Sequence, residues 1–479
     1  MYALGVPNPE RSDRMALSFP RWLAVPLLAA LPLDALASPA AGNLDLSGQW
    51  AGWLILALFV LAYALVVVEE RTGLRKSKPV MLAAALIWGL IAWRAAGDPA
   101  LPADFAANAF RRIFLEFAEL FFFLISAMSF VAAMTERNVF EALRTALARR
   151  RFGYRALFWI TGLVSFFLSA VLDNLTTALI MSAVILAVGA GSPRFIALAF
   201  INLVVAANAG GAWCAFGDIT TLMVWQAHRV EFFDFFRIFL PSLVNWLVPA
   251  LCMHFALPTG APTPGMDGIR MKYGGWSVCA LFALTIVITV SARQFLQMPP
   301  VLGMLAGLAL LNLQGYFIRR HEIRQLKSET PGYDVFDLIA RAEWDTLLFF
   351  CGVLLCVGGL ATAGFLTLAS HQLYGQLGVT GANVAMGTLS AVVDNIPIMY
   401  AVLQMNPPMD HGQWLLITLT AGVGGSLLSI GSAAGVALMG ASQGRYTFSS
   451  HLRWTWAIAL GYIASIGVHL WLNAGHFTG

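Results

Sequence analysis

The chain has 479 residues, of which 59% are hydrophobic and 11% charged, and its mean hydropathy is +0.74. A soluble domain carries about 25% charged residues, so this composition excludes an ordinary soluble protein and indicates a chain that lies mostly in lipid. The net charge of +4 is small and gives no support for nucleic-acid binding. The five cysteines lie in apolar stretches without the paired spacing of metal ligands, so we interpret them as buried hydrophobic residues and expect no cofactor.

The N-terminal segment resembles a secretory signal. Three arginines precede the apolar run 22–37, which ends in the small-x-small pattern of a cleavage site. We therefore expect residues 1–37 to be a signal-peptide-like segment whose removal would leave the mature N-terminus on the periplasmic side of a bacterial inner membrane. An uncleaved first helix is the alternative, although two prolines and an aspartate make this run a poor membrane span.

Apolar runs of about the length that a membrane-spanning helix requires, roughly 20 residues, follow along the chain. They cover 49–68, 79–96, 113–134, 156–190, 195–225, 238–257, 275–296, 298–317, 346–369, 383–404, 413–440 and 452–473. Asp-Asn interrupts two of them, 156–190 and 383–404, so we predict re-entrant segments there. The loops after the first, third and eighth runs are rich in Lys and Arg, which places them in the cytoplasm if the N-terminus is outside.

Two halves of the chain repeat the same motifs in the same order. "SAVLDN" at 169–174 returns as "SAVVDN" at 390–395, and the glycines at 210, 211 and 217 return at 424, 425 and 431. A looser echo links "EFAELFFF" at 116–123 with "EWDTLLFF" at 343–350. The predicted topology runs the equivalent spans in opposite directions. We therefore predict two inverted repeats, the architecture that supports alternating access.

Acidic residues at membrane depth are costly, so Asp173, Asp218 and Asp394 are the first functional candidates. Neighbouring glycines favour helix breaks that present bare carbonyl groups, and oxygen ligands of this kind suit hard cations. The oxygen-bearing candidates are Asp173, Asn174, Thr176, Thr177, Asn208, Asp218, Thr220 and Thr221 in the first repeat, and Ser390, Asp394, Asn395, Ser426, Ser429 and Ser432 in the second.

A buried carboxylate also offers a route to proton coupling. Burial disfavours the charged form, so protons compete with metal ions for such a group. If one site holds either Na⁺ or H⁺ and must be occupied to move, exchange follows. Glu119 is a further candidate for a proton relay or gate, and Asp345, at the start of the corresponding span, is another. His228, in a predicted turn, is a weaker candidate for pH sensing.

The segments "SAVLDNLTTALIM", "NAGGAWCAFGDITTLMVWQA", "SAVVDNIPIMYAVL" and "GVGGSLLSIGSAAGVALMG" resemble the signatures of NhaD-type sodium/proton antiporters of the ion transporter superfamily, from about residue 48 to the C-terminus. The resemblance implies re-entrant hairpins, discontinuous helices, elevator-like motion and a homodimer. It also implies Na⁺ and probable Li⁺ as substrates exchanged for H⁺. The ion-binding residues that it implies are Asp173, Asn174, Asn208, Asp218, Thr220, Thr221, Ser390, Asp394, Asn395, Ser429 and Ser432, with Na⁺ at Asp173, Asn174, Asp218, Asp394 and Asn395.

The expected fold is therefore an all-α polytopic membrane protein with two inverted-topology repeats. We expect N-terminal spans over 38–112, a first repeat over 113–257, linking helices over 258–342 and a second repeat over 343–479. A sodium-coupled di- or tricarboxylate transporter is the nearest alternative, disfavoured because two aspartates would repel such an anion without an obvious intramembrane Lys or Arg. An intramembrane aspartyl protease is more remote, since the Gly-x-Gly-Asp motif is incomplete before Asp218; we expect no enzyme.

Overall fold

The computed structural model describes residues 44–149, 152–189, 192–261, 269–326, 334–340, 342–442 and 444–477. Within these ranges the chain forms helices and loops and no β-strand, which confirms the all-α prediction. Ten helices in the described chain are long and apolar enough to cross a membrane. The predicted signal-peptide-like segment, and the basic loop residues Arg150, Arg151, Lys327 and Arg341, lie outside the described residues.

The helices in chain order are α1 (Trp50–Val67), α2 (Glu69–Thr72), α3 (Ser77–Ala96), α4 (Phe105–Glu136), α5 (Val139–Arg149), α6 (Tyr154–Leu172), α7 (Asn174–Gly189), α8 (Pro193–Ala212), α9 (Ile219–Gln226), η1 (Phe232–Ile238), α10 (Phe239–His254), α11 (Gly275–Leu296), α12 (Pro300–Leu326), α13 (Val335–Ala340), α14 (Trp344–Thr362), α15 (Phe365–Leu389), α16 (Asn395–Met405), α17 (His411–Gly424), α18 (Ala433–Ala441), α19 (Phe448–Leu452), α20 (Thr455–Leu472) and η2 (Ala474–His476). Each apolar run of the sequence corresponds to one helix or to two consecutive helices.

Polar residues mark the points where apolar runs divide into two helices. Asp173 separates α6 from α7 with a left-handed φ of 65°, and its carboxylate accepts hydrogen bonds from the amide (2.8 Å) and hydroxyl (2.7 Å) of Thr176 in the first turn of α7. Asp218 and Ser432 are the N-caps of α9 and α18, and the side chain of each accepts a hydrogen bond from a backbone N–H of the following turn. Capping explains why helices restart at these residues inside apolar sequence.

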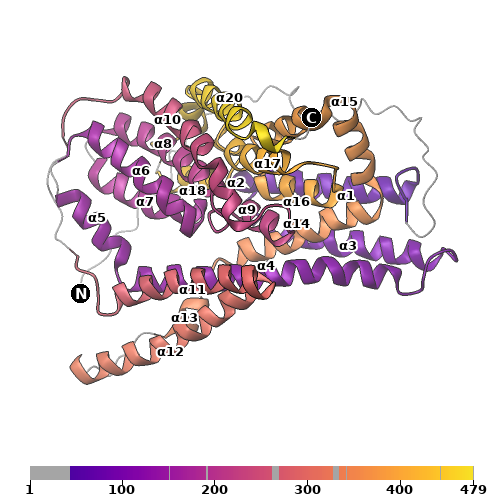
Figure 1. The fold of residues 1–479 in the computed structure, drawn as a ribbon, viewed down its shortest axis with the longest axis horizontal. Coiled ribbons are helices and arrows are strands. Elements are labelled where there is room, and N and C mark those ends of the chain that lie inside the picture. Colours follow the sequence, from indigo (N-terminus) through magenta and orange to yellow (C-terminus); the bar gives the residue numbers. More distant parts are fainter. Residues whose placement is uncertain are drawn as a thin grey trace, which may run out of the picture. The chain divides into compact units, whose positions relative to one another are not determined.

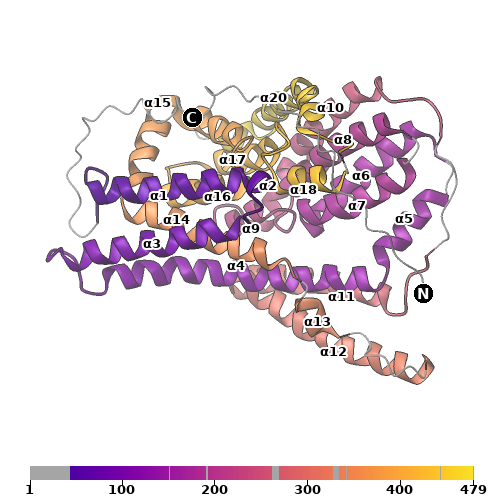
Figure 2. The same cartoon turned by 180° about the vertical axis from the view of Figure 1, so that it is seen from behind.

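Two groups of helices make up the described chain (Figures 1 and 2). The long helices α3, α4 and α14 pack along one another, and α11 and α12 pack beside α4. In the other group α6 packs on α8, α15 on α17, and α10 on α20, while α8 and α17 contact each other. Contacts of α14 with α15 and α16 join the groups. The polar helix ends described above lie where these groups meet.

The two halves place equivalent helices in equivalent contacts. α7 of the first half packs on α18 of the second half, and α16 of the second half packs on α9 of the first half. In both pairs, the helix that follows a repeated Asp-Asn motif contacts the helix that restarts after a break in the other half. The Ser169 hydroxyl donates to the Ala207 carbonyl (2.6 Å), and the Ser390 hydroxyl donates to the Ala421 carbonyl at the corresponding place (3.0 Å). These matched contacts follow the sequence repeat, while the inverted orientation of the halves across a membrane stays a prediction.

Glycines allow the two broken helices to approach their neighbours. A Cβ atom on Gly210 would lie 2.1 Å from the carbonyl oxygen of Phe166 in α6, and one on Gly424 would lie 1.9 Å from that of Gly387 in α15. Any larger residue would clash with backbone atoms that cannot rotate away. The repeated glycine pair therefore sets the distance between α6 and α8 and between α15 and α17.

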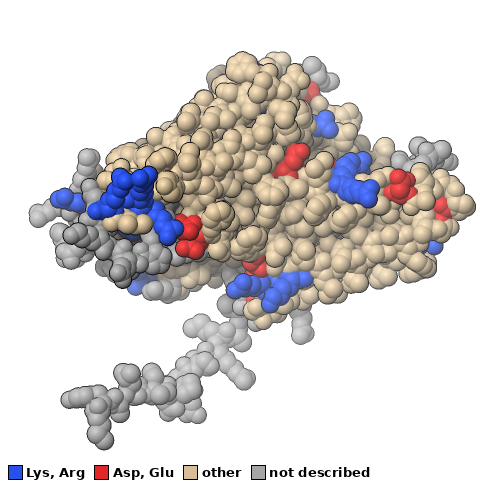
Figure 3. Space-filling view, turned by 90° about the horizontal axis from the view of Figure 1, so that it is seen from below, with Lys and Arg blue, Asp and Glu red and all other residues tan. Residues whose placement is uncertain are grey.

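The surface is largely uncharged. Figure 3 shows Lys, Arg, Asp and Glu side chains gathered in small clusters that leave wide areas without charge. Large apolar residues such as Leu82, Val287 and Ile463 are at least 60% exposed on the long helices. A soluble protein rarely exposes apolar surface so widely, whereas a protein surrounded by lipid does so by necessity.

Candidate functional site

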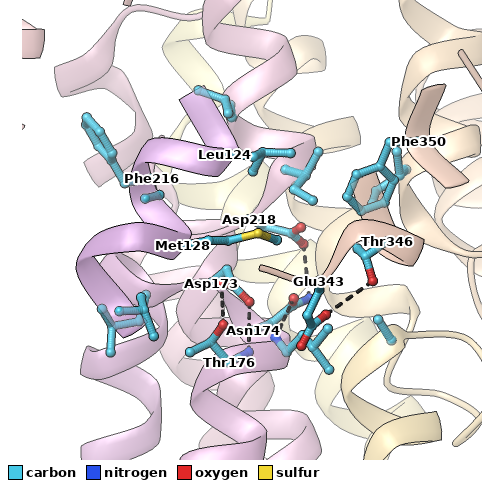
Figure 4. A pocket seen from close by; sticks show the side chains of 18 of the residues that line it. Leu124, Met128, Asp173, Asn174, Thr176, Phe216, Asp218, Glu343, Thr346 and Phe350 are labelled. Carbon is cyan, nitrogen blue, oxygen red and sulfur yellow. Dashed lines mark hydrogen bonds between the residues drawn. The ribbon is translucent and has the colours of Figure 1, made fainter. Parts of the chain in front are cut away.

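A cavity of about 60 Å³ lies where the helix breaks of the two halves meet (Figure 4). That volume has room for a few water molecules or a partly hydrated ion. Its polar lining comes from Asp173, Asn174 and Thr176 of the first repeated motif, Asp218 of the following break, Asp394 and Asn395 of the second motif, and Lys76, Glu343 and Thr346 from outside the motifs. The structure therefore brings Asp173, Asp218 and Asp394, predicted from sequence, into one shared cavity.

Asp218 occupies the centre of the hydrogen-bond network. Its Oδ2 accepts a hydrogen bond of 2.6 Å from the amide of Asn395 and one of 3.4 Å from the amide of Asn174. The two asparagines occupy the same position in the two repeated motifs, and Asp218 is only 3% exposed. A single buried carboxylate thus links the two halves of the chain.

Asn208 extends this network into the second half. Its carbonyl oxygen accepts a hydrogen bond of 3.0 Å from Asn174, and its amide donates to the hydroxyls of Ser426 (2.9 Å) and Ser432 (3.0 Å). Asn208 is fully buried in α8, while both serines flank the break between α17 and α18. The amide therefore orients Asn174 and ties the broken helix of the second half to the cavity.

One oxygen atom of a lining residue, Oδ1 of Asp394, is buried and has no hydrogen-bond partner in the described chain. The buried hydroxyls of Thr177 and Thr220, each next in sequence to a lining residue, also have none. The backbone N–H of Asp394 donates to the hydroxyl of Tyr63 in α1 (3.1 Å), which holds the loop while leaving that carboxylate oxygen unused. An unsatisfied buried polar group costs about 1–3 kcal/mol, so a bound cation or water at these oxygens would remove a penalty.

The charge of the cavity favours a cation. Four carboxyl groups line it (Asp173, Asp218, Glu343 and Asp394), and Lys76 is the one cationic side chain among the described lining residues. The Glu343 carboxylate accepts a hydrogen bond from the hydroxyl of Thr346 (3.2 Å). Among the described residues, no group of three or more His, Cys, Asp or Glu lies close enough together to hold a metal ion by itself. The lining combines carboxylate, amide and hydroxyl oxygens, and ligands of these types suit a hard monovalent or divalent cation.

Some predicted ligands have structural partners near the cavity instead. The Thr221 hydroxyl donates to the Asp218 carbonyl (2.7 Å), and it closes a capping box by accepting from the Asp218 N–H. The Ser390 hydroxyl is bonded to α17, and the Ser429 hydroxyl contacts the sulfur of Met439 (3.4 Å). These hydroxyls hold helix ends in place. Their assignment as direct ion ligands stays a prediction.

The two proposed relay residues lie apart from the cavity lining. Glu119 is on α4, where it interacts electrostatically with Glu116 on the same helix and with Arg293 of α11. The Asp345 carboxylate accepts a hydrogen bond of 2.5 Å from the hydroxyl of Ser77, at the start of α3. Glu343, two residues before Asp345, lines the cavity instead. Of these three acidic residues, Glu343 is thus the one that lines the cavity.

Sequence reasoning assigned no site role to Lys76 and Glu343, which line the cavity, or to His451, which contacts the nearby break between α17 and α18. Lys76 was one of several basic loop residues, and nothing in the sequence separates it from Arg75 or Lys78. Glu343 was recognisable only through the loose echo of the 116–123 segment. His451, fully buried, was not considered: its Nε2 contacts the carbonyl oxygen of Ser426 (2.9 Å) and its Nδ1 contacts the Tyr446 hydroxyl (2.8 Å).

The break between α17 and α18 presents fewer bare carbonyl groups than the glycines suggested. His451 occupies the Ser426 carbonyl, and the Thr455 hydroxyl donates to the Leu427 carbonyl (3.0 Å). Both partners come from the segment that follows α18. The unwound backbone is therefore held rigidly by the protein, and the side chains of Ser426 and Ser432 rather than these carbonyls reach toward the site.

Comparison with known proteins identifies the family. A family model described as a citrate transporter matches residues 63–422. The Na(+)/H(+) antiporter NhaD of Alkalimonas amylolytica is 50% identical over 95% of this chain and 98% of its own length, and that of Vibrio cholerae is 49% identical over 93% and 97%. This chain belongs to the NhaD-type antiporters. A sodium/proton antiporter of Arabidopsis thaliana is more distant, at 30% identity over 93% of the chain.

Membership of the NhaD-type family agrees with the resemblance inferred from the four motifs. These relatives are named as antiporters, which confirms the prediction of a transporter rather than an enzyme, and their names imply no cofactor. Together with the ten long apolar helices, they show that the NhaD-type chain is a multi-pass membrane protein.

Proposed function

We propose that this protein exchanges Na⁺ for H⁺ across the bacterial inner membrane by alternating access. The observation that carries the proposal is the shared cavity, which four carboxyl groups and one ammonium group line and where Oδ1 of Asp394 is buried without a partner in the described chain. This excess of negative charge attracts a cation, and the names of the relatives give Na⁺ and H⁺ as the exchanged ions.

The exchange step follows from competition for the same carboxylates. Asp173, Asp218 and Asp394 together with Asn174 and Asn395 provide the oxygens for Na⁺, because these side chains of both halves line one cavity and both asparagines bond Asp218. Protons bind the carboxylates when Na⁺ leaves. Two unlike occupants of one site then travel in opposite directions, which couples their gradients without a separate proton channel.

The finer parts of the proposal concern movement, selectivity and assembly. The helix breaks at Asp173, Asp218, Asp394 and Ser432 and the matched contacts of the two halves support a moving unit built from two inverted repeats with re-entrant hairpins. Li⁺, which also prefers oxygen ligands, is proposed as a second substrate. A homodimer and a periplasmic mature N-terminus complete the proposal, on the basis of the family resemblance and the loop charges.

Transport of a di- or tricarboxylate is the second candidate, because the matching family model is described as a citrate transporter. Lys76 also places at the cavity the cationic group that the sequence did not reveal there. Against this candidate, a single ammonium group does not offset four carboxyl groups, so a multivalent anion meets net repulsion.

Proton movement in everted membrane vesicles, from a host without its own sodium exchangers, distinguishes the candidates. Respiration acidifies the vesicles, and NaCl, LiCl, KCl or sodium citrate is then added while a pH-sensitive dye is followed. The exchanger alkalinises the lumen with Na⁺ or Li⁺ whatever the anion, and Asp173→Asn and Asp394→Asn remove the response. Citrate uptake without a Na⁺ response between about pH 6.5 and 9.5 would leave the second candidate in place.

A further inference from the structure

Lys76 brings a fixed positive charge to the cation cavity. It directly precedes α3, and its backbone N–H donates to the carboxylate of Glu69 in α2 (3.3 Å), which fixes the loop. The side chain lines the cavity, with Nζ 4.8 Å from the ring centre of Phe349 in α14. An aromatic face stabilises an ammonium group while leaving its N–H donors available.

Lys76 shares the cavity with Asp394, the carboxylate of the second repeated motif. The two groups line the same cavity and interact electrostatically, yet none of the salt bridges in the described chain joins Lys76 to a carboxylate. Oδ1 of Asp394 is buried and has no hydrogen-bond partner in the described chain. The lysine stem is long and flexible, so modest rotation changes how closely the ammonium group approaches this oxygen.

The other charges at the cavity make this lysine distinctive. Asp173 and Asp218 come from the first half and Glu343 from the residue before α14, and all three are acidic. The neighbouring basic residues Arg75 and Lys78 are exposed and do not line the cavity. Lys76 is therefore the one described side chain that can offset the carboxylates from inside the site.

We propose that the Lys76 ammonium group is a built-in competitor of the transported cation, neutralising Asp394 while the cavity is empty and yielding that carboxylate when Na⁺ binds. The inference rests on the proposed function and adds a residue outside the repeated motifs. The benefit is kinetic. A cavity with four carboxylates and no positive charge would bind Na⁺ too tightly to release it quickly, and the Lys76 ammonium group lowers this affinity.

The proposal predicts that a substitution inside the cavity raises the affinity for Na⁺ instead of lowering it. Removing a unit positive charge near the ion strengthens Na⁺ binding, because Coulomb repulsion between Lys76 and Na⁺ is lost. We expect Lys76→Gln to lower the half-saturating Na⁺ concentration on the order of tenfold, and to lower the maximal exchange rate as release slows. Loss of an ordinary supporting residue would instead weaken binding or reduce the amount of folded protein.

The test measures initial exchange rates against Na⁺ concentration, at one fixed pH, for wild type, Lys76→Gln, Lys76→Arg and Lys78→Gln. Lys78→Gln removes an exposed charge from the same loop, so it should stay within about twofold of wild type. Lys76→Arg keeps the charge and should therefore shift the half-saturating Na⁺ concentration less than Lys76→Gln does. The purified proteins are also tested in detergent for thermal stabilisation by NaCl against choline chloride. Lys76→Gln should reach half of its maximal stabilisation at a lower Na⁺ concentration than wild type.

Each outcome has a distinct meaning. An unchanged or raised half-saturating Na⁺ concentration in Lys76→Gln, with a wild type that exchanges normally, would overturn the competitor role alone. The same conclusion follows if Lys78→Gln lowers that concentration equally, because the effect would then come from the loop's general charge. If the wild type itself shows no Na⁺-dependent proton movement and no stabilisation by Na⁺, the proposed function fails.

Discussion

Asp218 is the residue on which the two halves converge. Asn174 and Asn395 both donate to the same oxygen of its carboxylate, and the aspartate also caps α9. An isosteric amide at this position keeps the volume but turns one acceptor into a donor. Such a change separates the charge of the site from its shape, which substitution by alanine does not.

Asp218→Asn should therefore abolish Na⁺-dependent exchange in everted vesicles. In one orientation, the new NH₂ group would point at the NH₂ groups of Asn174 and Asn395, and donor would then face donor. In the other orientation, an uncharged amide oxygen would accept from the two asparagines. The negative charge is lost in both orientations. The cost of the broken hydrogen bonds is about 1–3 kcal/mol. Asp345→Asn is the matched control: its carboxylate bonds Ser77 away from the cavity, so exchange should continue. Activity lost equally in both variants would contradict this division of roles.

His228 lies outside the membrane-spanning helices, in the loop after α9, where its protonation can make the stability of the protein depend on pH. Its Nδ1 contacts the guanidinium of Arg293, and burial together with that charge lowers the pKa of His228, against a weaker opposing effect of Glu231. The folded protein therefore favours the neutral ring. The resulting stability is present above the ordinary pKa of 6.5 and is lost as the pH falls below it.

His228→Asn should reduce the loss of thermal stability between pH 7.5 and 5.5, as measured by the melting temperature of purified protein. Asparagine suits the left-handed φ of 57° at this position. The effect should be small because the imidazole is exposed to solvent. Exchange between about pH 6.5 and 9.5 should keep the wild-type profile, since the lowered pKa of His228 moves its titration away from this range. A shifted exchange profile would instead make His228 a pH sensor.

At the scale of elements, the broken helices depend on close backbone contacts. α8 and α17 each run past a neighbour at a glycine and then break before a capping residue. The sequence made these breaks predictable, because Gly-Gly followed by a capping Asp or Ser inside an apolar run is an unusual combination. It did not reveal that His451 and Thr455 hold the second break, since those contacts join segments that share no local pattern.

Gly424→Ala should destabilise the protein by about 1–3 kcal/mol, because a Cβ there would lie 1.9 Å from the Gly387 carbonyl oxygen and force α15 away from α17. The measurements are the melting temperature of the purified protein and its yield in the membrane. Gly467→Ala in α20 is the control, since a Cβ at that glycine meets no atom within 4 Å. Alanine also favours helix over glycine by about 1 kcal/mol. Equal melting temperatures for the two variants would contradict the contact-based explanation.

At the scale of the whole molecule, the site forms where helices of the first half of the chain pack against helices of the second half. Periodicity and composition predicted the helices, and the repeated motifs predicted Asp173, Asp218 and Asp394 as a set. They did not predict that α7 packs on α18 and α16 on α9, which turns two sets of candidate ligands into one cavity. Lys76 and Glu343 enter from helices of the other group, and only the three-dimensional arrangement could have selected them.

A cavity shared by two repeats should open to each side of the membrane in turn, and a cysteine at Thr346 can report this. Thr346 lines the cavity, and the chain's own cysteines (Cys214, Cys252, Cys279, Cys351 and Cys356) would first be replaced by serine or alanine. A membrane-impermeant thiol reagent should label Thr346→Cys in both right-side-out and inverted vesicles. Na⁺ should slow the labelling by occupying the cavity, whereas K⁺ should have little effect.

Arg320→Cys, at an exposed position of α12 outside the cavity lining, provides the control for this experiment because its labelling should not respond to Na⁺. Reversing the Na⁺ gradient should shift the labelling of Thr346→Cys from one vesicle orientation toward the other. If the cysteine reacts from the same side under every gradient, the cavity opens to one side only and alternating access around it is wrong. Labelling from both sides at once, unaffected by Na⁺, would indicate a continuous pore instead of an exchanger.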